Sequence, residues 1–469
     1  MSRTLRTFRT LRERRGRHGR IRARAVALAT VFATGVGALA LTPQPASAAP
    51  DYTGDPVLYW NDVLLGAIRT AGGTPGPISR AAAEMNAAIY DAESSYQLRW
   101  HTMTSDPYLQ AVDYAAWAEG PGEEERIIGR TAYNILLKLF PGQTTYLDNK
   151  FKERFGTSPT DFDLLDATVV NKVVTTMWNF RTADGSEDQT AYTPDGRPGA
   201  WLPTSYPDLP DPACSQGSQA AIPAWGKVKP WALTSGSQFR PSTPGQYASY
   251  ENLLASPAYA EQVRQVRDLG GAGSTTRTTD QTAAAWFWAN DANGTYKPPG
   301  QLLDITARVS RDRGLTAYQN ARLFALVSVA MADAAIAEWD VKYQTPIDLW
   351  RPVSAIREGL RDTTWQPLSG TTPCFPAWAS GHSAFGAAWA GIMRQYFKTD
   401  GITFTASTDD PKSPVKNRTF TSFSQAAREE ADSRVWLGVH YPWDASDGLT
   451  LGENVATWVF THKMKSVGS

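Results

Sequence analysis

The chain has 469 residues, with 46 basic and 46 acidic side chains, 42% hydrophobic residues and 17 tryptophans. This apolar content is sufficient for a large core and excludes a disordered chain. The balance of charge conceals an asymmetry, because the first 48 residues contain ten arginines and one glutamate and leave 36 basic and 45 acidic residues after them. Because residues 49–469 carry an excess of acidic side chains, they are a poor general binder of nucleic acid, and we expect no nucleic-acid partner.

The first 48 residues are typical of an export signal peptide. A basic stretch up to Arg24 precedes an apolar run at 25–41 and a small-residue cleavage site at 46–48. We therefore expect a secreted protein, and the arginine pair at 14–15 suggests the twin-arginine route. A membrane anchor is the less favoured alternative, since the run is only about 17 residues of mostly small side chains. No later run is expected to span a membrane, so no stable membrane insertion is predicted.

Helical periodicity dominates the chain after the signal. Strict alternation of apolar and polar residues, typical of strands, is almost absent. Apolar residues recur at steps of three and four in the stretches 57–71, 78–96, 125–140 and 166–183. These stretches predict an N-terminal helical bundle over residues 49–183.

Residues 184–244 interrupt the helical pattern. Pro, Gly and Trp are frequent there, which favours a long ordered crossover on the surface of a bundle over a flexible linker. Helical periodicity resumes afterwards and predicts a second bundle over 245–469. The predicted fold is all-α, with two helical halves joined by an irregular crossover.

A weak internal repeat links the two halves. The dipeptides Asp91-Ala92 and Asp333-Ala334 both follow helical stretches rich in small residues. The repeat suits two related bundles, and chance similarity between Ala-rich helices is the alternative.

The chain contains two cysteines, Cys214 and Cys374. In an oxidising compartment they could form one disulfide, and two unrelated buried thiols are the alternative. No cysteine or histidine spacing typical of a metal site is present.

Three stretches of the C-terminal half combine cations, small residues and histidines. Their chemically capable members are Lys342 and Arg351, then Ser380, Gly381 and His382, and then Arg434 and His440. Each alone is weak evidence, because a single charge near a helix end is usually solvated and a single histidine in an apolar stretch is usually a core residue. Together they fit an oxyanion, since three cations neutralise its charge and the two guanidinium groups match pairs of anionic oxygens.

The middle stretch predicts a helix that begins at Ser380-Gly381. Unpaired N–H groups at such a helix start favour an anion, and glycine allows the backbone to approach it closely. One histidine could bond to the central atom of the oxyanion while the other transfers a proton. Because the three stretches are far apart in sequence, their side chains would converge from different helices of one bundle.

In this order, the motifs Lys with Arg-Pro, Ser-Gly-His, and Arg with a His six residues later resemble those of the vanadium-dependent haloperoxidases and the type 2 phosphatidic acid phosphatase superfamily. The stretches 80–92, 195–204 and 223–233 are similar to the bacterial, secreted haloperoxidase-like branch. The resemblance implies two four-helix-bundle-like halves, with the active site in the second.

The resemblance also implies roles for individual residues. His440 would be bonded to vanadium, or would be the nucleophile of a phosphatase, and His382 would be the acid–base residue. The vanadate oxygens would be held by Lys342, Arg351, Ser380, Gly381 and Arg434. Eight residues separate Lys342 from Arg351, more than the family commonly has, so either the segment 344–348 bulges, with a helix break near Pro346, or the lysine is displaced.

Four further residues match positions around the family's pocket. Asp291 would pair with Arg434, while Trp339 and Phe375 would line the halide side. An aromatic residue at position 375 is found in chloroperoxidase-like members, which implies competence with chloride. Asp444 could orient the imidazole of His440, and a simple helix cap is the alternative.

The same pocket could serve two reactions. As a haloperoxidase, the protein would use vanadate to oxidise halide with hydrogen peroxide, with Lys342 polarising the peroxide, and the hypohalous product would halogenate an organic acceptor. As a phosphatase, it would form a phosphohistidine at His440, since phosphate can occupy the same site. The aromatic pair and the long N-terminal half favour the haloperoxidase. A protein that only binds an oxyanion is a third alternative, supported by the altered lysine spacing.

Overall fold

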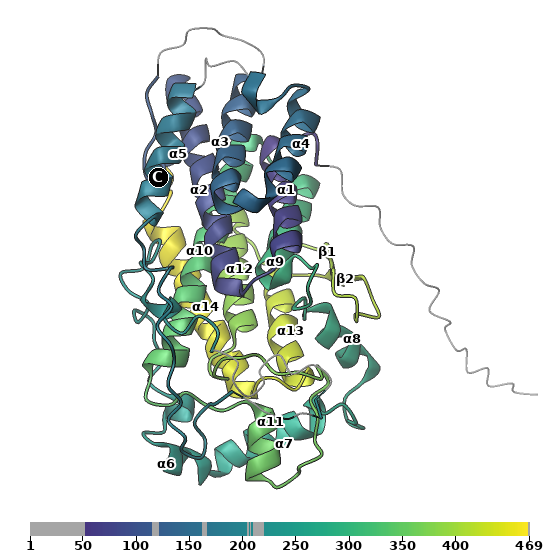
Figure 1. The fold of residues 1–469 in the computed structure, drawn as a ribbon. Helices are drawn as coiled ribbons and strands as arrows, with labels where there is room; N and C mark the ends of the chain where they lie inside the picture. Colours follow the sequence, from purple (N-terminus) through teal and green to yellow (C-terminus); the bar gives the residue numbers. More distant parts are fainter. Residues whose placement is uncertain are drawn as a thin grey trace, which may run out of the picture. The chain divides into compact units, whose positions relative to one another are not determined.

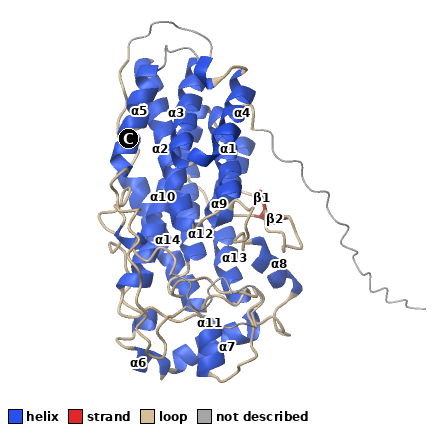
Figure 2. Ribbon diagram, viewed as in Figure 1, coloured by secondary structure: helices blue, strands red, loops and turns tan. Residues whose placement is uncertain are grey.

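Helices account for nearly all the regular structure of the described chain (Figure 2). The computed structural model describes residues 52–114, 122–161, 167–203, 206, 208–209 and 220–467. The predicted export signal and Cys214 lie outside these residues. The strands of the described residues form one hairpin, in which β1 (Phe404–Ser407) pairs antiparallel with β2 (Asn417–Phe420). The predicted all-α class is confirmed.

The N-terminal helices pack around α2. Their bounds are α1 (Pro56–Ala71), α2 (Pro75–Arg99), α3 (Glu123–Leu139), α4 (Thr144–Phe155) and α5 (Ala167–Arg181), with short 3₁₀ turns at Pro141–Gln143 and Pro159–Asp161. Figure 1 shows these helices gathered side by side. Helix α1 begins where the predicted apolar pattern begins, because Asp55 Oδ1 accepts hydrogen bonds from the N–H groups of Val57 and Leu58. Buried side chains such as Trp60 and Tyr90 fill the space between the helices.

The C-terminal helices are more numerous and differ more in length. They are α6 (Tyr250–Leu254), α7 (Pro257–Gly270), α8 (Thr279–Phe287), α9 (Lys297–Arg313), α10 (Ala317–Gln344), α11 (Pro352–Ser354), α12 (Gly381–Phe397), α13 (Phe423–Trp436) and α14 (Pro442–His462), with a π-helical turn at Ala355–Gly359. Helices α10, α12, α13 and α14 pack against one another, and α10 also packs along α2. The described residues from Tyr52 onward form one compact unit, and the boundaries expected at 183 and 245 stay predictions.

Helix α10 is the central helix of the molecule. It starts with a capping box, in which Thr316 and Gln319 each accept a hydrogen bond from the other's backbone N–H. Of the described helices, it alone is long and apolar enough to cross a membrane, so the expectation that no such run follows the signal was wrong. Its most apolar window is 94% buried, because α2 covers one side and α12 and α14 cover others. The composition is explained by burial within the protein.

The repeated Asp-Ala dipeptides have equivalent structural roles. Asp91 in α2 accepts hydrogen bonds from three consecutive backbone N–H groups at 108–110. Asp333 in α10 accepts hydrogen bonds from three consecutive N–H groups at 231–233, at 2.7 to 2.9 Å. Both carboxylates are buried. Each half therefore uses a buried aspartate to anchor an irregular segment on its central helix, which supports a common design over chance.

The described part of the crossover is irregular but anchored. Between α5 and α6 its helical structure consists of the 3₁₀ turns Trp225–Lys227 and Pro244–Gln246. Ala221 donates its N–H to the carbonyl of Cys374 and accepts a hydrogen bond from the indole of Trp339, so the crossover reaches the wall of the site described below. Cys374 is disulfide-bonded, and the chain's only other cysteine is Cys214.

Candidate functional site

Most of the predicted site residues line one cavity of about 500 Å³ in the C-terminal half. Its wall includes Trp339, Phe375, Gly381, His382, Arg434 and His440, which come from α10, α12, α13 and the loops before α12 and α14. Lys342, Arg351 and Ser380 do not belong to the wall and lie behind it, fully buried. Tertiary packing thus brings together three stretches that are far apart in the sequence.

The imidazole of His440 is held from two sides. Its Nδ1 lies 3.0 Å from Oδ2 of Asp444 and its Nε2 lies 3.1 Å from Nη1 of Arg351. The carboxylate accepts the Nδ1 proton, so Nε2 keeps its lone pair and accepts a hydrogen bond from the guanidinium. Burial, reinforced by Arg351 and Lys342, holds the pKa of His440 well below its usual range. His440 is therefore neutral and can act as a ligand or nucleophile through Nε2.

Asp444 combines the two roles considered for it. Its Oδ2 also accepts a hydrogen bond from the N–H of Tyr441 at 3.1 Å, at the start of α14. It is fully buried, and burial raises its pKa to about 7 despite that N–H group and the nearby Lys342 and Arg351. Helix capping and imidazole orientation are thus both performed by one oxygen atom.

Arg351 and Arg434 each leave a guanidinium N–H group unused. Arg351 donates to the carbonyls of Phe375 and Val439, both at 2.8 Å, but its Nη2 has no partner among the described residues. Arg434 lies 3.5 Å from Asp291 through Nη2, and its Nε likewise has no partner in the described chain. Both guanidinium groups are buried, where an unused donor is costly. These orphaned donors fit a bound oxyanion.

The helix start predicted at Ser380-Gly381 is confirmed. Ser380 is the N-cap of α12, its Oγ faces the N–H of Ser383 at 3.4 Å, and Gly381 is the first helical residue. His382, in the first turn, is partly exposed to the cavity, and its Nε2 donates to the carbonyl of Ala289 at 3.2 Å. Burial and the neighbouring Arg434 hold the pKa of His382 well below its usual value. A neutral imidazole at the cavity can exchange a proton, and the acid–base role of His382 stays a prediction.

Lys342 is directed away from the cavity. Helix α10 continues to Gln344, so the helix break falls after the lysine, as the extra spacing before Arg351 required. The ammonium group donates to the carbonyls of Pro376, Ala377 and Ala379. Burial lowers its pKa to about 8. Lys342 therefore fixes the loop before α12 and contributes charge, while its predicted direct contact with an oxyanion stays a prediction.

The aromatic pair forms the apolar side of the cavity. The rings of Trp339 and Phe375 pack with centroids 5.1 Å apart. The Phe375 ring also lies 4.7 Å from the guanidinium of Arg351 and 4.9 Å from the ammonium of Lys342. The wall therefore combines an apolar aromatic surface with the cations Lys342 and Arg351 close to the ring of Phe375.

The sequence reasoning missed Glu338. This residue is fully buried in α10, and its Oε1 lies 2.8 Å from Nζ of Lys342. The spacing of four residues between a glutamate and a lysine in one helix was the available signal. Such pairs are usually solvated, so their spacing alone does not indicate a site.

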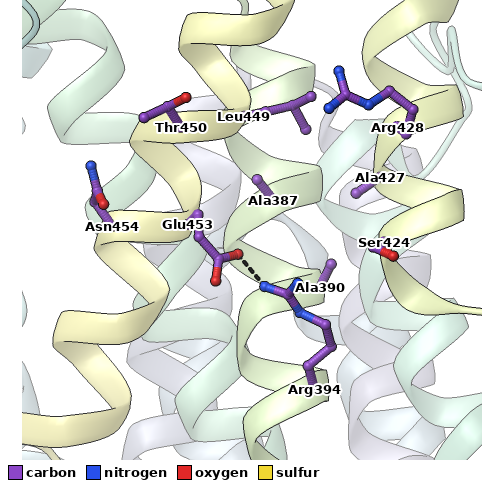
Figure 3. Close-up of a pocket in the computed structure, with 10 residues that line it drawn as sticks. All are labelled: Ala387, Ala390, Arg394, Ser424, Ala427, Arg428, Leu449, Thr450, Glu453 and Asn454. Atoms are coloured by element: carbon purple, nitrogen blue, oxygen red, sulfur yellow. Dashed lines mark hydrogen bonds and ion pairs between the residues drawn. The ribbon is translucent and has the colours of Figure 1, made fainter. Parts of the chain in front are cut away.

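A second cavity, shown in Figure 3, lies between α12, α13 and α14. It has a volume of about 410 Å³, a floor of alanine side chains and an ion pair between Arg394 and Glu453. None of its lining residues is a histidine, so the chemistry above belongs to the first cavity. The described residues contain no cluster of three potential metal ligands of the His, Cys, Asp and Glu types. The cations and N–H donors of the first cavity fit an anion.

Comparison with known proteins finds vanadium-dependent haloperoxidases among the relatives of this chain. Residues 322–469 match a family model described as the second helical-bundle domain of vanadium chloroperoxidase. Vanadium chloroperoxidase of Curvularia inaequalis is 28% identical over 288 residues, which cover 49% of this chain and 46% of that protein. The match thus spans about half the length of this curated relative.

Solved structures share the fold over most of the chain. A bacterial vanadium-dependent iodoperoxidase superposes with a TM-score of 0.73 at 23% identity, covering 89% of this chain and 99% of its own. The holo form of a bacterial vanadium-dependent chloroperoxidase superposes with a TM-score of 0.65 at 16% identity, covering 84% of this chain and 94% of its own. At such identities the likeness is one of fold.

Proposed function

Because residues 322–469 match the second helical-bundle domain of vanadium chloroperoxidase, we propose that the protein is a vanadate-dependent haloperoxidase. It would oxidise halide with hydrogen peroxide and halogenate an organic acceptor. One observation carries the proposal: two neutral histidines and Arg434 line a cavity with an aromatic wall, and Arg351 behind that wall has, like Arg434, a buried donor without a partner among the described residues.

The residues of the cavity have distinct tasks in this reaction. Bound vanadate would act as a Lewis acid that activates peroxide toward halide. His440 would hold the metal through Nε2, while Arg351 and Arg434 would direct their unused N–H groups to its oxygens. The N–H groups at the start of α12 add neutral donors. His382 would move a proton through Nδ1, and Trp339 with Phe375 would exclude water from the halide.

The phosphatase alternative uses the same cations, since phosphate and vanadate have similar shape and charge. The apolar pair Trp339 and Phe375 argues against it, because hydrolysis needs a water molecule in the cavity and gains nothing from a dehydrated wall. The 3.5 Å pairing of Asp291 with Arg434 further reduces the positive charge offered to a dianionic ester.

A paired assay tests the proposal. The protein, purified without phosphate and loaded with orthovanadate, should brominate a dye when supplied with peroxide and bromide, and should hydrolyse a generic phosphate ester poorly. His440→Ala should abolish bromination, whereas His462→Ala, an exposed residue at the end of α14, should leave it unchanged. Bromination that survives His440→Ala would contradict the assignment.

We also propose that the protein is secreted. The basic and apolar composition of residues 1–48 supports export, and the disulfide bond of Cys374 suits an oxidising compartment. The protein should be expressed in its native host and recovered from the culture medium. N-terminal sequencing of this protein should give a chain that starts at Ala49. A protein retained in the cytoplasm with its first residues intact would contradict export.

A further inference from the structure

Glu338 is a buried carboxylate that the proposed chemistry does not use. It precedes Lys342 by one helical turn of α10, and its side chain is fully buried. Its Oε1 forms the ion pair with Lys342, but its Oε2 has no hydrogen-bond partner among the residues that the structure describes. An unused acceptor on a buried charge costs free energy, so the arrangement favours a further partner.

The unused oxygen lies against the start of helix α12. A Cβ atom added to Gly381 would lie 3.1 Å from Oε2 and 3.3 Å from Oε1 of Glu338. The absent side chain of Gly381 therefore provides the space for this carboxylate, in addition to the close approach expected from the sequence. Gly381 also belongs to the cavity wall, so the carboxylate lies immediately beside the place where the helix start would hold an anion.

A carboxylate discriminates among anions by their protons. When ionised it only accepts hydrogen bonds, so it can bind an oxyanion only through an oxygen that carries a proton. It repels an oxyanion that carries none, and low-polarity surroundings strengthen the repulsion. The unused donors of Arg351 and Arg434 would bind the unprotonated oxygens of such an anion, so the donors and the acceptor together would suit a partly protonated ligand.

We propose that Glu338 is a specificity-determining residue that admits oxyanions bearing a hydroxyl group and rejects unprotonated dianions. The identification of vanadate as the natural ligand rests on the proposed function. Vanadate near neutral pH carries hydroxyl groups, whereas a phosphate monoester is mainly a dianion with three acceptor oxygens. The cations of the site suit either ligand. Glu338 would favour the binding of vanadate over that of a phosphate ester.

Sulfate and hydrogen phosphate allow a direct test on the unmodified protein. At mildly alkaline pH both are tetrahedral dianions of similar size, and only hydrogen phosphate carries a hydroxyl group. Calorimetric titration of the full mature chain without vanadate should show that hydrogen phosphate binds at least about tenfold more tightly than sulfate, the effect of one hydrogen bond to a charged group. Equal affinities for the two ions would overturn the proposal.

A pair of isosteric variants locates the discrimination. Glu338→Gln should raise the affinity for sulfate by about tenfold with a smaller change for hydrogen phosphate, because the amide offers a donor without charge. Asp340→Asn is the matched control, since it removes a charge from the same helix at a residue that pairs with Arg240 and lies against Gly226 instead of Gly381. This control should keep the wild-type preference.

The remaining outcomes separate this proposal from others. An equal loss of affinity for both ions in Glu338→Gln would mean that Glu338 only supports the fold, and would overturn the proposal. A Glu338→Gln variant that does not fold leaves the wild-type comparison of the two ions as the deciding result. A protein that discriminates between the ions as expected but never brominates would refute the haloperoxidase and not the selectivity.

Discussion

Oδ2 of Asp444 accepts a hydrogen bond from Nδ1 of His440, and the two atoms are 3.0 Å apart. Asp444 follows His440 by four residues, about one helical turn. This contact places the imidazole lone pair on Nε2, the nitrogen that Arg351 also contacts. Because the same oxygen also caps the start of α14, the orientation of the imidazole is coupled to the fold of the helix that follows it.

Replacing the carboxylate of Asp444 should lower the affinity for vanadate without abolishing binding. Asp444→Asn keeps the size of the side chain but removes the charge that fixes the imidazole tautomer. Partners of this kind contribute about 10- to 100-fold to metal affinity or activity, so vanadate affinity and bromination rate should both fall by that factor. Titration with orthovanadate measures the first. Asp447→Asn is the control, because Asp447 lies three residues further along the helix and accepts a hydrogen bond from the indole of Trp378. Equal vanadate affinities in the two variants would refute the role of Asp444.

Anion binding should weaken as the pH rises through the pKa of Lys342. Burial lowers that pKa from 10.5 to about 8, with Glu338 opposing the effect and Arg351 adding to it. The site therefore loses one positive charge near this pH, and the affinity for hydrogen phosphate, whose own charge stays constant in mildly alkaline solution, should decrease. Calorimetric titration at several pH values measures the decrease. The double variant Lys342→Met with Glu338→Gln should show no such step, and a step that persists in it belongs to another group.

The apolar wall should permit oxidation of chloride. Chloride is more strongly hydrated than bromide, so it depends more on a dehydrated surface such as that of Phe375 and Trp339. The vanadate-loaded protein should oxidise both halides at acidic pH. Phe375→His should lose most chloride oxidation and retain bromide oxidation, while Phe375→Leu, which keeps the wall apolar, should retain both. A wild-type protein that brominates a dye but never oxidises chloride would contradict this expectation.

Close packing of α14 against the start of α12 should be essential for the site. A Cβ atom added to Gly448 would lie 2.6 Å from the carbonyl oxygen of Ser380 and 2.8 Å from Cβ of Ser383. Gly448→Ala should therefore lower the free energy of unfolding by roughly 1–3 kcal/mol and weaken vanadate binding, because the start of α12 must move. Urea denaturation measures the first effect. Gly142→Ala, where the added Cβ meets nothing within 4 Å, should leave both quantities unchanged.

Local features of the fold could be predicted from the sequence. The periodicity gave the all-α class, and the Ser-Gly pair gave the start of α12, because helix formation and capping depend on residues within a few positions of each other. The paired dipeptides at Asp91 and Asp333 were also visible, although only their three backbone N–H partners show that the two residues have the same role.

The residue types of the site could be identified from the three motifs, which supply cations, donors and two histidines in a fixed order. The directions of these side chains follow from the packing of the helices. Lys342 points to backbone carbonyls, Arg351 reaches His440, and Glu338 enters the space left by Gly381. The direction of a buried side chain depends on neighbours from elsewhere in the fold, and in these contacts those neighbours lie 34 to 89 residues away in sequence. No local pattern records such contacts, so the selectivity proposed for this cavity could be inferred only from the packed molecule.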